Sequence, residues 1–236
     1  MKYIDFHTHI LPEIDDGAKS VSESIEMLKV AKLSGAETVI LTPHYDAEVS
    51  ISEFIKKRDE KLYLLQNEMK ASGGDFPKIR VGAEVYINTS LSEMPDLKKL
   101  CITDTNLLLL ELPYTSWNVW HYKEVFNISQ NHDVVPVMAH IERYLSGPKD
   151  LKKLEPLIDI GAQFQINAES FLSIFGKKII RELAAEGLIC AFASDCHNLL
   201  DRSPDISRAL KVFAKKFDDS FIEYIYERSS NLLNSR

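Results

Sequence analysis

The first twenty residues, MKYIDFHTHILPEIDDGAKS (residues 1–20), place two histidines directly after a short apolar run. We expect Tyr3–Phe6 to form a β-strand, because a short apolar run of this kind is typical of a buried strand. His7 and His9 are two residues apart, so on an extended chain their side chains project to the same face. The stretch predicts a strand that ends in two candidate metal ligands, with a pair of hydrogen-bonded histidines as the alternative.

Similar apolar runs recur along the chain and alternate with segments of helical periodicity. Their continuous apolar character suits strands that are buried on both faces, as in a parallel sheet. The expected strands are Tyr3–Phe6, Thr38–Thr42, Ile79–Ala83, Leu107–Leu112, Val134–Ala139, Phe164–Ile166 and Ile189–Ala193. The expected helices are residues 20–35, Ile51–Ala71, Val119–Gln130, Asp150–Ile160, Phe171–Glu186 and Ile206–Arg228. Seven alternations without a linker or repeat predict one barrel-like α/β domain over residues 1–236.

Composition limits the kind of partner and the compartment. The chain has 236 residues, is 45% hydrophobic and carries a net charge of −7, which disfavours nucleic acid as a partner. Cys101, Cys190 and Cys196 lack the spacing of a disulfide framework or zinc finger, which favours a reducing, cytoplasmic location. We expect no signal peptide and no insertion into a membrane, because no stretch approaches about 20 apolar residues. Composition leaves the oligomeric state open.

Histidines and carboxylates follow nearly every expected strand, in DFHTH, LTPH, VGAEV, LLELP, VMAHIER and FASDCH. The carboxyl ends of parallel barrel strands open on one rim, so we expect these side chains to converge there. Mixed imidazole and carboxylate ligands suit zinc, manganese or iron, and their number exceeds a closed structural site. Asp16 in DDG has a turn residue as its alternative interpretation. The candidate ligands are His7, His9, Asp16, His44, Glu84, Glu111, His140, Asp195 and His197.

The order of these motifs resembles the PHP (polymerase and histidinol phosphatase) superfamily of trinuclear metal phosphoesterases. Within it, three stretches resemble the bacterial protein-tyrosine phosphatases of capsular and exopolysaccharide operons (CpsB/CapC-like). They are DFHTHILPEIDDGAKS (residues 5–20), MAHIERY (residues 138–144) and SDCHNLLDRSP (residues 194–204). The resemblance extends from residue 3 to about residue 206 in family order.

The resemblance implies a distorted (β/α)7 barrel in which the nine candidate ligands hold three divalent metal ions. It implies manganese as the activating ion, with iron or zinc as alternatives. The implied activity is hydrolysis of phosphotyrosine on a bacterial tyrosine kinase by metal-activated water, which regulates capsule or exopolysaccharide synthesis. Arg143 and Arg202 are expected to clamp the phosphate, because a guanidinium presents forked donors to oxyanions. For Arg143, an ion pair with Glu142 is the alternative.

Two other patterns near the rim have competing interpretations. Cys196 and Arg202 match the Cys-x5-Arg spacing of cysteine-dependent tyrosine phosphatases, but the intervening HNLLD contains no glycine. A thiolate beside Asp195 is also electrostatically disfavoured, so we expect no cysteine nucleophile. Aromatic residues follow several rim positions and could form a collar around a phosphotyrosine ring, a hydrophobic cover or an oligomer contact. They are Tyr45, Tyr114, Trp117 and Trp120.

Two further functions compete with a protein-tyrosine phosphatase. The same scaffold can carry a small-molecule phosphatase of the histidinol-phosphate type. It can also be a metal-binding or kinase-binding regulatory module without turnover. The complete set of candidate ligands argues against the second alternative, because a non-catalytic relative would be free to lose ligands.

Overall fold

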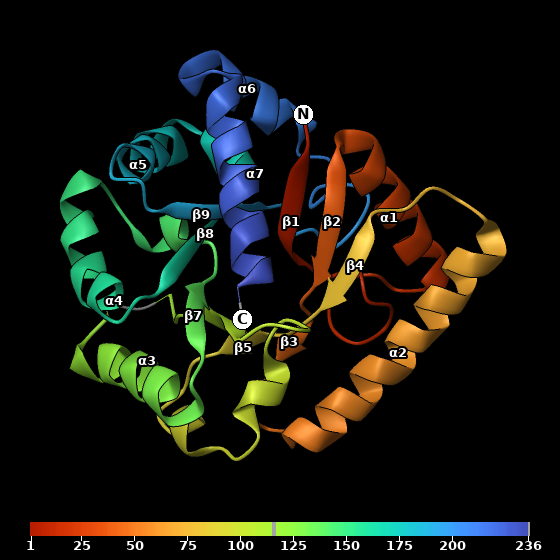
Figure 1. Cartoon of the computed structure of the whole chain (residues 1–236), viewed down its shortest axis with the longest axis horizontal. Helices are drawn as coiled ribbons and strands as arrows, with labels where there is room; N and C mark the ends of the chain where they lie inside the picture. The colour runs from red at the N-terminus through yellow and green to blue at the C-terminus, as the bar shows by residue number, and fades with distance from the viewer. Residues whose placement is uncertain (115–116, 236) are drawn as a thin grey trace.

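Parallel β-strands form the centre of the computed structural model, which describes residues 1–114 and 117–235 (Figure 1). Every pairing between neighbouring strands is parallel. The strands are β1 (Tyr3–Thr8), β2 (Ala36–Leu41), β3 (His44–Tyr45), β4 (Lys78–Val81), β5 (Glu84–Tyr86), β6 (Leu107–Glu111), β7 (Val135–Met138), β8 (Gln163–Asn167) and β9 (Ile189–Ala193).

The strands occupy seven positions around a barrel. One sheet has the order β1-β2-β4 and the other has the order β3-β5-β6-β7-β8-β9. β3 continues β2 and β5 continues β4 in the same pairing order, so each interrupted pair counts as one strand position. The N–H of His9 donates to the carbonyl of Cys196 at 2.9 Å, and Thr8 and Cys196 form a parallel bridge that joins β1 to the end of β9. This is the expected distorted (β/α)7 barrel.

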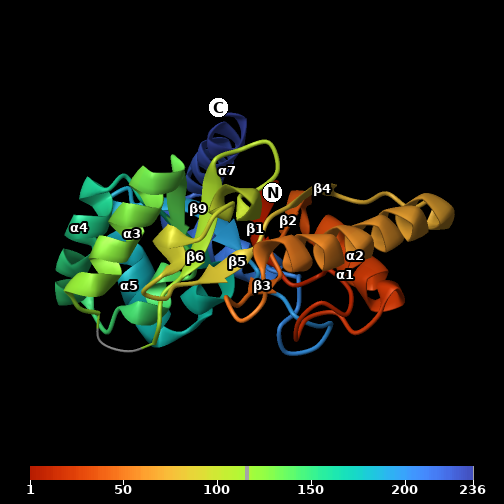
Figure 2. The same cartoon turned by 90° about the horizontal axis from the view of Figure 1, so that it is seen from below.

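Helices cover the outside of the strands. Figures 1 and 2 show α1 (Val21–Ser34) and α2 (Ile51–Ser72) on one side, and α3 (Val119–His132), α4 (Glu155–Asp159) and α5 (Ile174–Ala185) on the other. The last two helices are α6 (Ser207–Phe217) and α7 (Asp219–Asn234). Over residues 1–114 and 117–235, each helix is too short or too polar for a membrane span.

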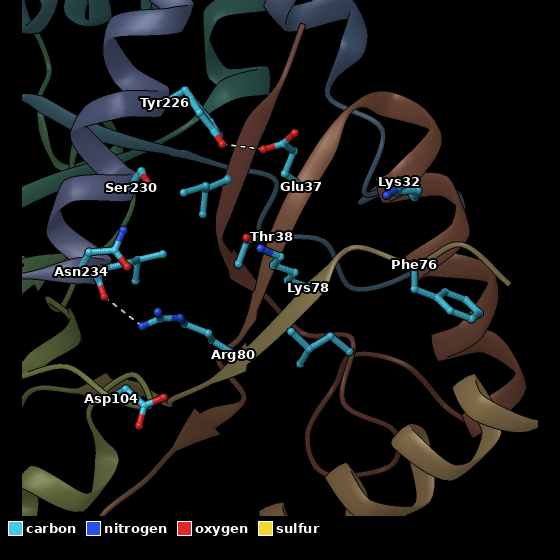
Figure 3. A pocket seen from close by; sticks show the side chains of 13 residues that line it. Lys32, Glu37, Thr38, Phe76, Lys78, Arg80, Asp104, Tyr226, Ser230 and Asn234 are labelled. Atoms are coloured by element: carbon cyan, nitrogen blue, oxygen red, sulfur yellow. Dashed lines mark hydrogen bonds between the residues drawn. The ribbon is translucent and has the colours of Figure 1, made fainter. Parts of the chain in front are cut away.

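Helix α7 closes the amino-terminal end of the barrel. Its Leu233 joins an inner apolar cluster with Ile4 and Phe6 of β1. Tyr226 of α7 donates a hydrogen bond to Glu37 at the start of β2, and Arg80 of β4 donates to the Leu233 carbonyl at 3.0 Å (Figure 3). Because α7 contacts the beginnings of the strands, the opposite rim, where the strands end, stays open for a site.

The expected helices agree with the structure at some boundaries and differ at others. α1 begins as expected, with Ser20 Oγ accepting from the Glu23 N–H, and ends at Gly35 in the left-handed conformation. The prediction of a single helix over Ile206–Arg228 was wrong. Asp218 has φ 67° and separates α6 from α7.

Two other expectations for secondary structure also need correction. The helix expected over Asp150–Ile160 is largely a 3₁₀ helix, Pro148–Leu154, followed by the short α4. The helix expected over Phe171–Glu186 begins only at Ile174, where Ser173 caps it. The two-residue and three-residue strands β3 and β5 were not predicted. They matter because each begins with a candidate ligand, His44 and Glu84.

Candidate metal centre

The structure brings all nine candidate ligands together at the carboxyl ends of the strands. They come from the end of β1 and the loop after it, from β3 and β5, from the last residue of β6, and from the segments after β7 and β9. Their ligand atoms form four overlapping groups, each within 4.8 Å. The groups are His9, Asp16, His44 and His197; His7, Glu84 and His140; His7, His9 and Asp195; and His44, Glu84 and Glu111.

The buried carboxylate of Glu84 lies at the centre of this cluster. Its Oε2 atom is 3.1 Å from His7 Nε2, 3.3 Å from His9 Nε2 and 3.0 Å from His44 Nδ1. Nevertheless, Glu84 Oε2 and the buried His197 Nε2 have no partner with hydrogen-bond geometry among the described residues. Burial of polar atoms without partners is costly. A cluster of converging donor atoms that includes buried atoms without hydrogen-bond partners fits a site built for divalent cations.

Electrostatics in the cluster also favour cations. Burial and the neighbouring carboxylate of Glu84 raise the pKa of Glu111 to about 7. Burial and the neighbouring His9 lower the pKa of His197 to about 4. Crowded carboxylates repel each other, and a cation between them relieves that repulsion while using the imidazole lone pairs.

Asp15, which was not predicted as a site residue, accepts hydrogen bonds from two of the segments that carry candidate ligands. The Nδ1–H of His9 donates to Asp15 Oδ2 at 2.8 Å, and the backbone N–H of His44 donates to the same oxygen at 3.0 Å. The side chain of Asp15 is 5% exposed, whereas that of Asp16 is 63% exposed and its Oδ1 lies 3.2 Å from His197 Nε2. The two adjacent aspartates therefore differ in role: Asp16 joins the donor atoms, and Asp15 orients a histidine. A doubled Asp after His-x-His was the available signal.

Strand β8 supplies amides where its neighbours supply candidate ligands. Gln165 Oε1 accepts from the His140 backbone N–H at 2.9 Å and lies 3.4 Å from His7 Nδ1. Asn167 Nδ2 donates to Asp195 Oδ2 at 2.9 Å. Both amides hold candidate ligands in position. The sequence signal for these two residues is the alternation of polar Gln165 and Asn167 with apolar Phe164 and Ile166 in FQIN.

Both predicted arginines lie at the cluster and contact one carboxylate. Arg143 Nη2 is 2.8 Å from Asp195 Oδ2, and Arg202 Nη2 donates to Asp195 Oδ1 at 2.8 Å. The alternative pair of Arg143 with Glu142 is not formed, because buried Glu142 instead accepts from the Ser170 hydroxyl at 2.8 Å. Both arginines line a cavity of about 170 Å³ together with His44, Glu84, Glu111, Tyr114, His140 and Asp195. The cavity joins guanidinium donors to the candidate ligands.

Cys196 is placed where it cannot act as a nucleophile. Its side chain is fully buried, and burial raises the pKa of its thiol well above the usual value. Only a thiolate attacks efficiently, so this geometry agrees with the expectation against cysteine chemistry.

The four aromatic residues for which a collar, a hydrophobic cover and an oligomer contact were all open lie in different settings. Tyr45 is buried against Phe54, with ring centroids 5.1 Å apart, and Trp120 stacks on His121 of α3 at 3.7 Å. Trp117 is half-buried and packs against Tyr144. Tyr114 is exposed and lines the cavity.

A parallel α/β barrel that gathers imidazoles, carboxylates and arginines at the ends of its strands has the architecture of a metal-dependent hydrolase. The family model described as "Capsular polysaccharide synthesis, CpsB/CapC" matches residues 3–234. The chain belongs to this family.

Individual relatives match nearly the whole chain. Tyrosine-protein phosphatase YwqE of Bacillus subtilis (strain 168) is 33% identical, over 99% of this chain and 92% of the relative. Tyrosine-protein phosphatase CpsB of Streptococcus pneumoniae is 32% identical, over 91% of this chain and 90% of the relative. A solved structure from work on YwqE and CpsB, described as unique metal-dependent tyrosine phosphatases, superposes with a TM-score of 0.82 at 29% identity. That match covers 98% of this chain and 94% of the other.

Proposed function

We propose that this protein is a metal-dependent phosphotyrosine-protein phosphatase, with residues 1–236 as its single catalytic domain. The observation that carries the proposal is the convergence of nine candidate ligands and two arginines on one cavity. Cations and guanidiniums are the groups that stabilise a phosphoryl group in transfer. The naming of full-length relatives as tyrosine-protein phosphatases supports the choice of substrate.

The proposed ligands are the four groups of donor atoms described above, and the proposed cofactor is three divalent ions. Manganese is our choice for the activating ion, with iron and zinc as alternatives that the same donors accept. Ions bound there would lower the pKa of water and neutralise charge on the non-bridging phosphate oxygens. Glu84 Oε2 lies close to nitrogens of His7, His9 and His44, so Glu84 would help to hold more than one of these ions.

Arg143 and Arg202 are the proposed phosphate clamps. Their side chains are 35% and 38% exposed, so their outer N–H groups can reach a ligand that enters from solvent. Both now contact Asp195, whose negative charge would be shared with a cation when the site is loaded. Each guanidinium can then offer its remaining N–H donors to a phosphate oxygen while its contact with Asp195 keeps it oriented.

The leaving group places a small demand on the protein. A tyrosinate has a conjugate-acid pKa near 10, much lower than that of an alkoxide. It departs without strong protonation, so the proposal assigns no general acid.

The proposed substrate is phosphotyrosine on a bacterial tyrosine kinase that takes part in capsule or exopolysaccharide synthesis. The description of the family as one of capsular polysaccharide synthesis supports this context. We propose a cytoplasmic location, because Cys101, Cys190 and Cys196 are all free thiols, buried in the core. Nucleic acid is not a proposed partner, given the net charge of −7.

A metal-reconstitution assay tests this function. The purified chain would be stripped with a chelator, reloaded separately with Mn²⁺, Fe²⁺ or Zn²⁺, and assayed on a phosphotyrosyl peptide and on histidinol phosphate. We expect hydrolysis of the peptide to depend on added metal and to exceed hydrolysis of histidinol phosphate. Preference for histidinol phosphate would establish the small-molecule alternative. Absence of hydrolysis of both substrates with each of the three metals would overturn the proposal and favour a non-catalytic module.

A further inference from the structure

Tyr114 presents an exposed aromatic ring at the edge of the cavity that holds the arginines. Its side chain follows β6, lines the 170 Å³ cavity and is 62% exposed. The Tyr114 hydroxyl accepts a hydrogen bond from Arg143 Nη1 at 3.3 Å. One end of the ring is therefore tied to a proposed phosphate clamp, while much of the side chain faces solvent.

Packing behind Tyr114 holds the ring in a defined orientation. The ring stacks on Tyr144, with centroids 5.3 Å apart and planes inclined by 30°. It also lies nearly parallel to the imidazole of His140, at 6.2 Å and 12°. Trp117 packs against the same Tyr144 at 5.2 Å. An exposed ring supported in this way loses little conformational freedom when a ligand covers it.

The position of Tyr114 relative to Arg143 defines what can cover it. Arg143, Glu111, His140 and Tyr114 line the same cavity, so a phosphate held there by Arg143 would lie beside Tyr114. In an aryl phosphate, the ring is bonded directly to the ester oxygen. An aryl ring at that position could stack on Tyr114 in the offset arrangement that aromatic pairs prefer, with centroids about 4.5–7 Å apart. A short alkyl phosphate offers no ring to stack there.

We propose that Tyr114 is a specificity-determining residue whose ring is the platform on which the aryl group of the substrate stacks. This inference rests on the proposed phosphatase function and names the part of the site that selects aromatic esters. The hydroxyl of Tyr114 has a lesser role, as a partner of Arg143. An aromatic pair of this kind corresponds to a preference of about two- to tenfold.

Binding of non-hydrolysable phosphonates to the metal-loaded protein tests the platform without turnover. The dissociation constants of phenylphosphonate and methylphosphonate would be measured by calorimetry for wild type, Tyr114→Phe and Tyr114→Ala. We expect wild type and Tyr114→Phe to prefer phenylphosphonate and Tyr114→Ala to lose that preference, with methylphosphonate affinity unchanged within about twofold. Tyr63→Ala is the matched control, because Tyr63 on α2 is 65% exposed and lies outside the cavity lining.

Kinetics on a phosphotyrosyl peptide add a second readout. Tyr114→Ala should raise KM with a smaller change in kcat, whereas Tyr114→Phe, which keeps the ring and loses only the contact with Arg143, should raise KM less than Tyr114→Ala does. An unchanged phenyl preference in Tyr114→Ala would overturn the proposal. A loss in Tyr114→Phe equal to that in Tyr114→Ala would also overturn it, by assigning the effect to the hydroxyl. If wild type prefers phenylphosphonate but does not hydrolyse the peptide, the platform stands and the proposed function fails.

Discussion

The carboxylate of Asp195 lies 2.8 Å from the guanidinium of Arg143, and its second oxygen accepts from Arg202 at the same distance. One candidate ligand therefore orients both proposed phosphate clamps, which come from segments 59 residues apart in the numbering, 143 and 202. Burial raises the pKa of Asp195, but the neighbouring His7, His9, Arg143 and Arg202 outweigh that effect and hold the pKa well below its usual range. The arrangement couples the site for cations to the site for phosphate.

Replacement of Arg143 by lysine should separate charge from geometry. Lysine keeps the positive charge but loses the planar fork that can hold Asp195 and a phosphate oxygen together. We expect a loss of about 2 kcal/mol in transition-state stabilisation, about thirtyfold in kcat/KM on a phosphotyrosyl peptide, with metal content unchanged. Steady-state kinetics and elemental analysis of the variant check this. Activity of Arg143→Lys equal to that of wild type would show that a positive charge at position 143 is enough for catalysis, without the planar guanidinium.

Asp15→Asn should weaken metal binding although Asp15 is not among the proposed ligands. The neutral amide is a poorer acceptor for the His9 Nδ1–H, so the imidazole is less basic and less firmly oriented. We expect metal affinity to fall by about 10- to 100-fold in a titration against a competing chelator. Asp75→Asn, in an exposed pair with Lys32, is the control and should bind metal like wild type. If Asp15→Asn bound metal as tightly as wild type, Asp15 would have no role in positioning His9.

Cys196→Ser should leave catalysis largely intact, whereas His140→Ala should abolish most of it. The serine variant keeps the proposed ligands and should retain most phosphatase activity, at a cost of about 1 kcal/mol in stability for burying a hydroxyl. His140→Ala removes a proposed ligand and should lower kcat by about a hundredfold or more. Turnover measurements on the two variants, together with Tm values to show that both are folded, distinguish a metal-dependent mechanism from a cysteine-dependent one. The reverse pattern would restore a cysteine mechanism.

Gly17→Ala should disturb the site through the backbone. A Cβ atom at Gly17 would lie 2.0 Å from the carbonyl oxygen of His9, so the DDG loop would have to move. We expect the free energy of unfolding to fall by about 1–3 kcal/mol and metal affinity to fall with it. At Gly147, a Cβ would meet no described atom within 4 Å, so Gly147→Ala should be nearly neutral. Denaturant unfolding of both variants measures the difference.

Much of the barrel was predictable because its signals are local. Buried strands read as apolar runs, and Ser20 and Gly35 bracket α1 as capping rules predict. The break between α6 and α7 was not predictable in this way, because Asp218 adopts a positive φ of 67° inside a continuous helical pattern. The strands β3 and β5 were missed because two or three residues are too few to show a period.

The order of motifs along the chain determined which residues are candidate ligands and that they would share one rim. That inference holds because the ends of parallel strands must meet on one side of a barrel. Only the tertiary structure decided that Asp15 supports His9, that Arg143 contacts Asp195 and not Glu142, and that Tyr45 is buried while Tyr114 is exposed. These contacts and exposures depend on burial and on distances between side chains from different strands. Neither quantity can be read from the spacing of residues along one chain.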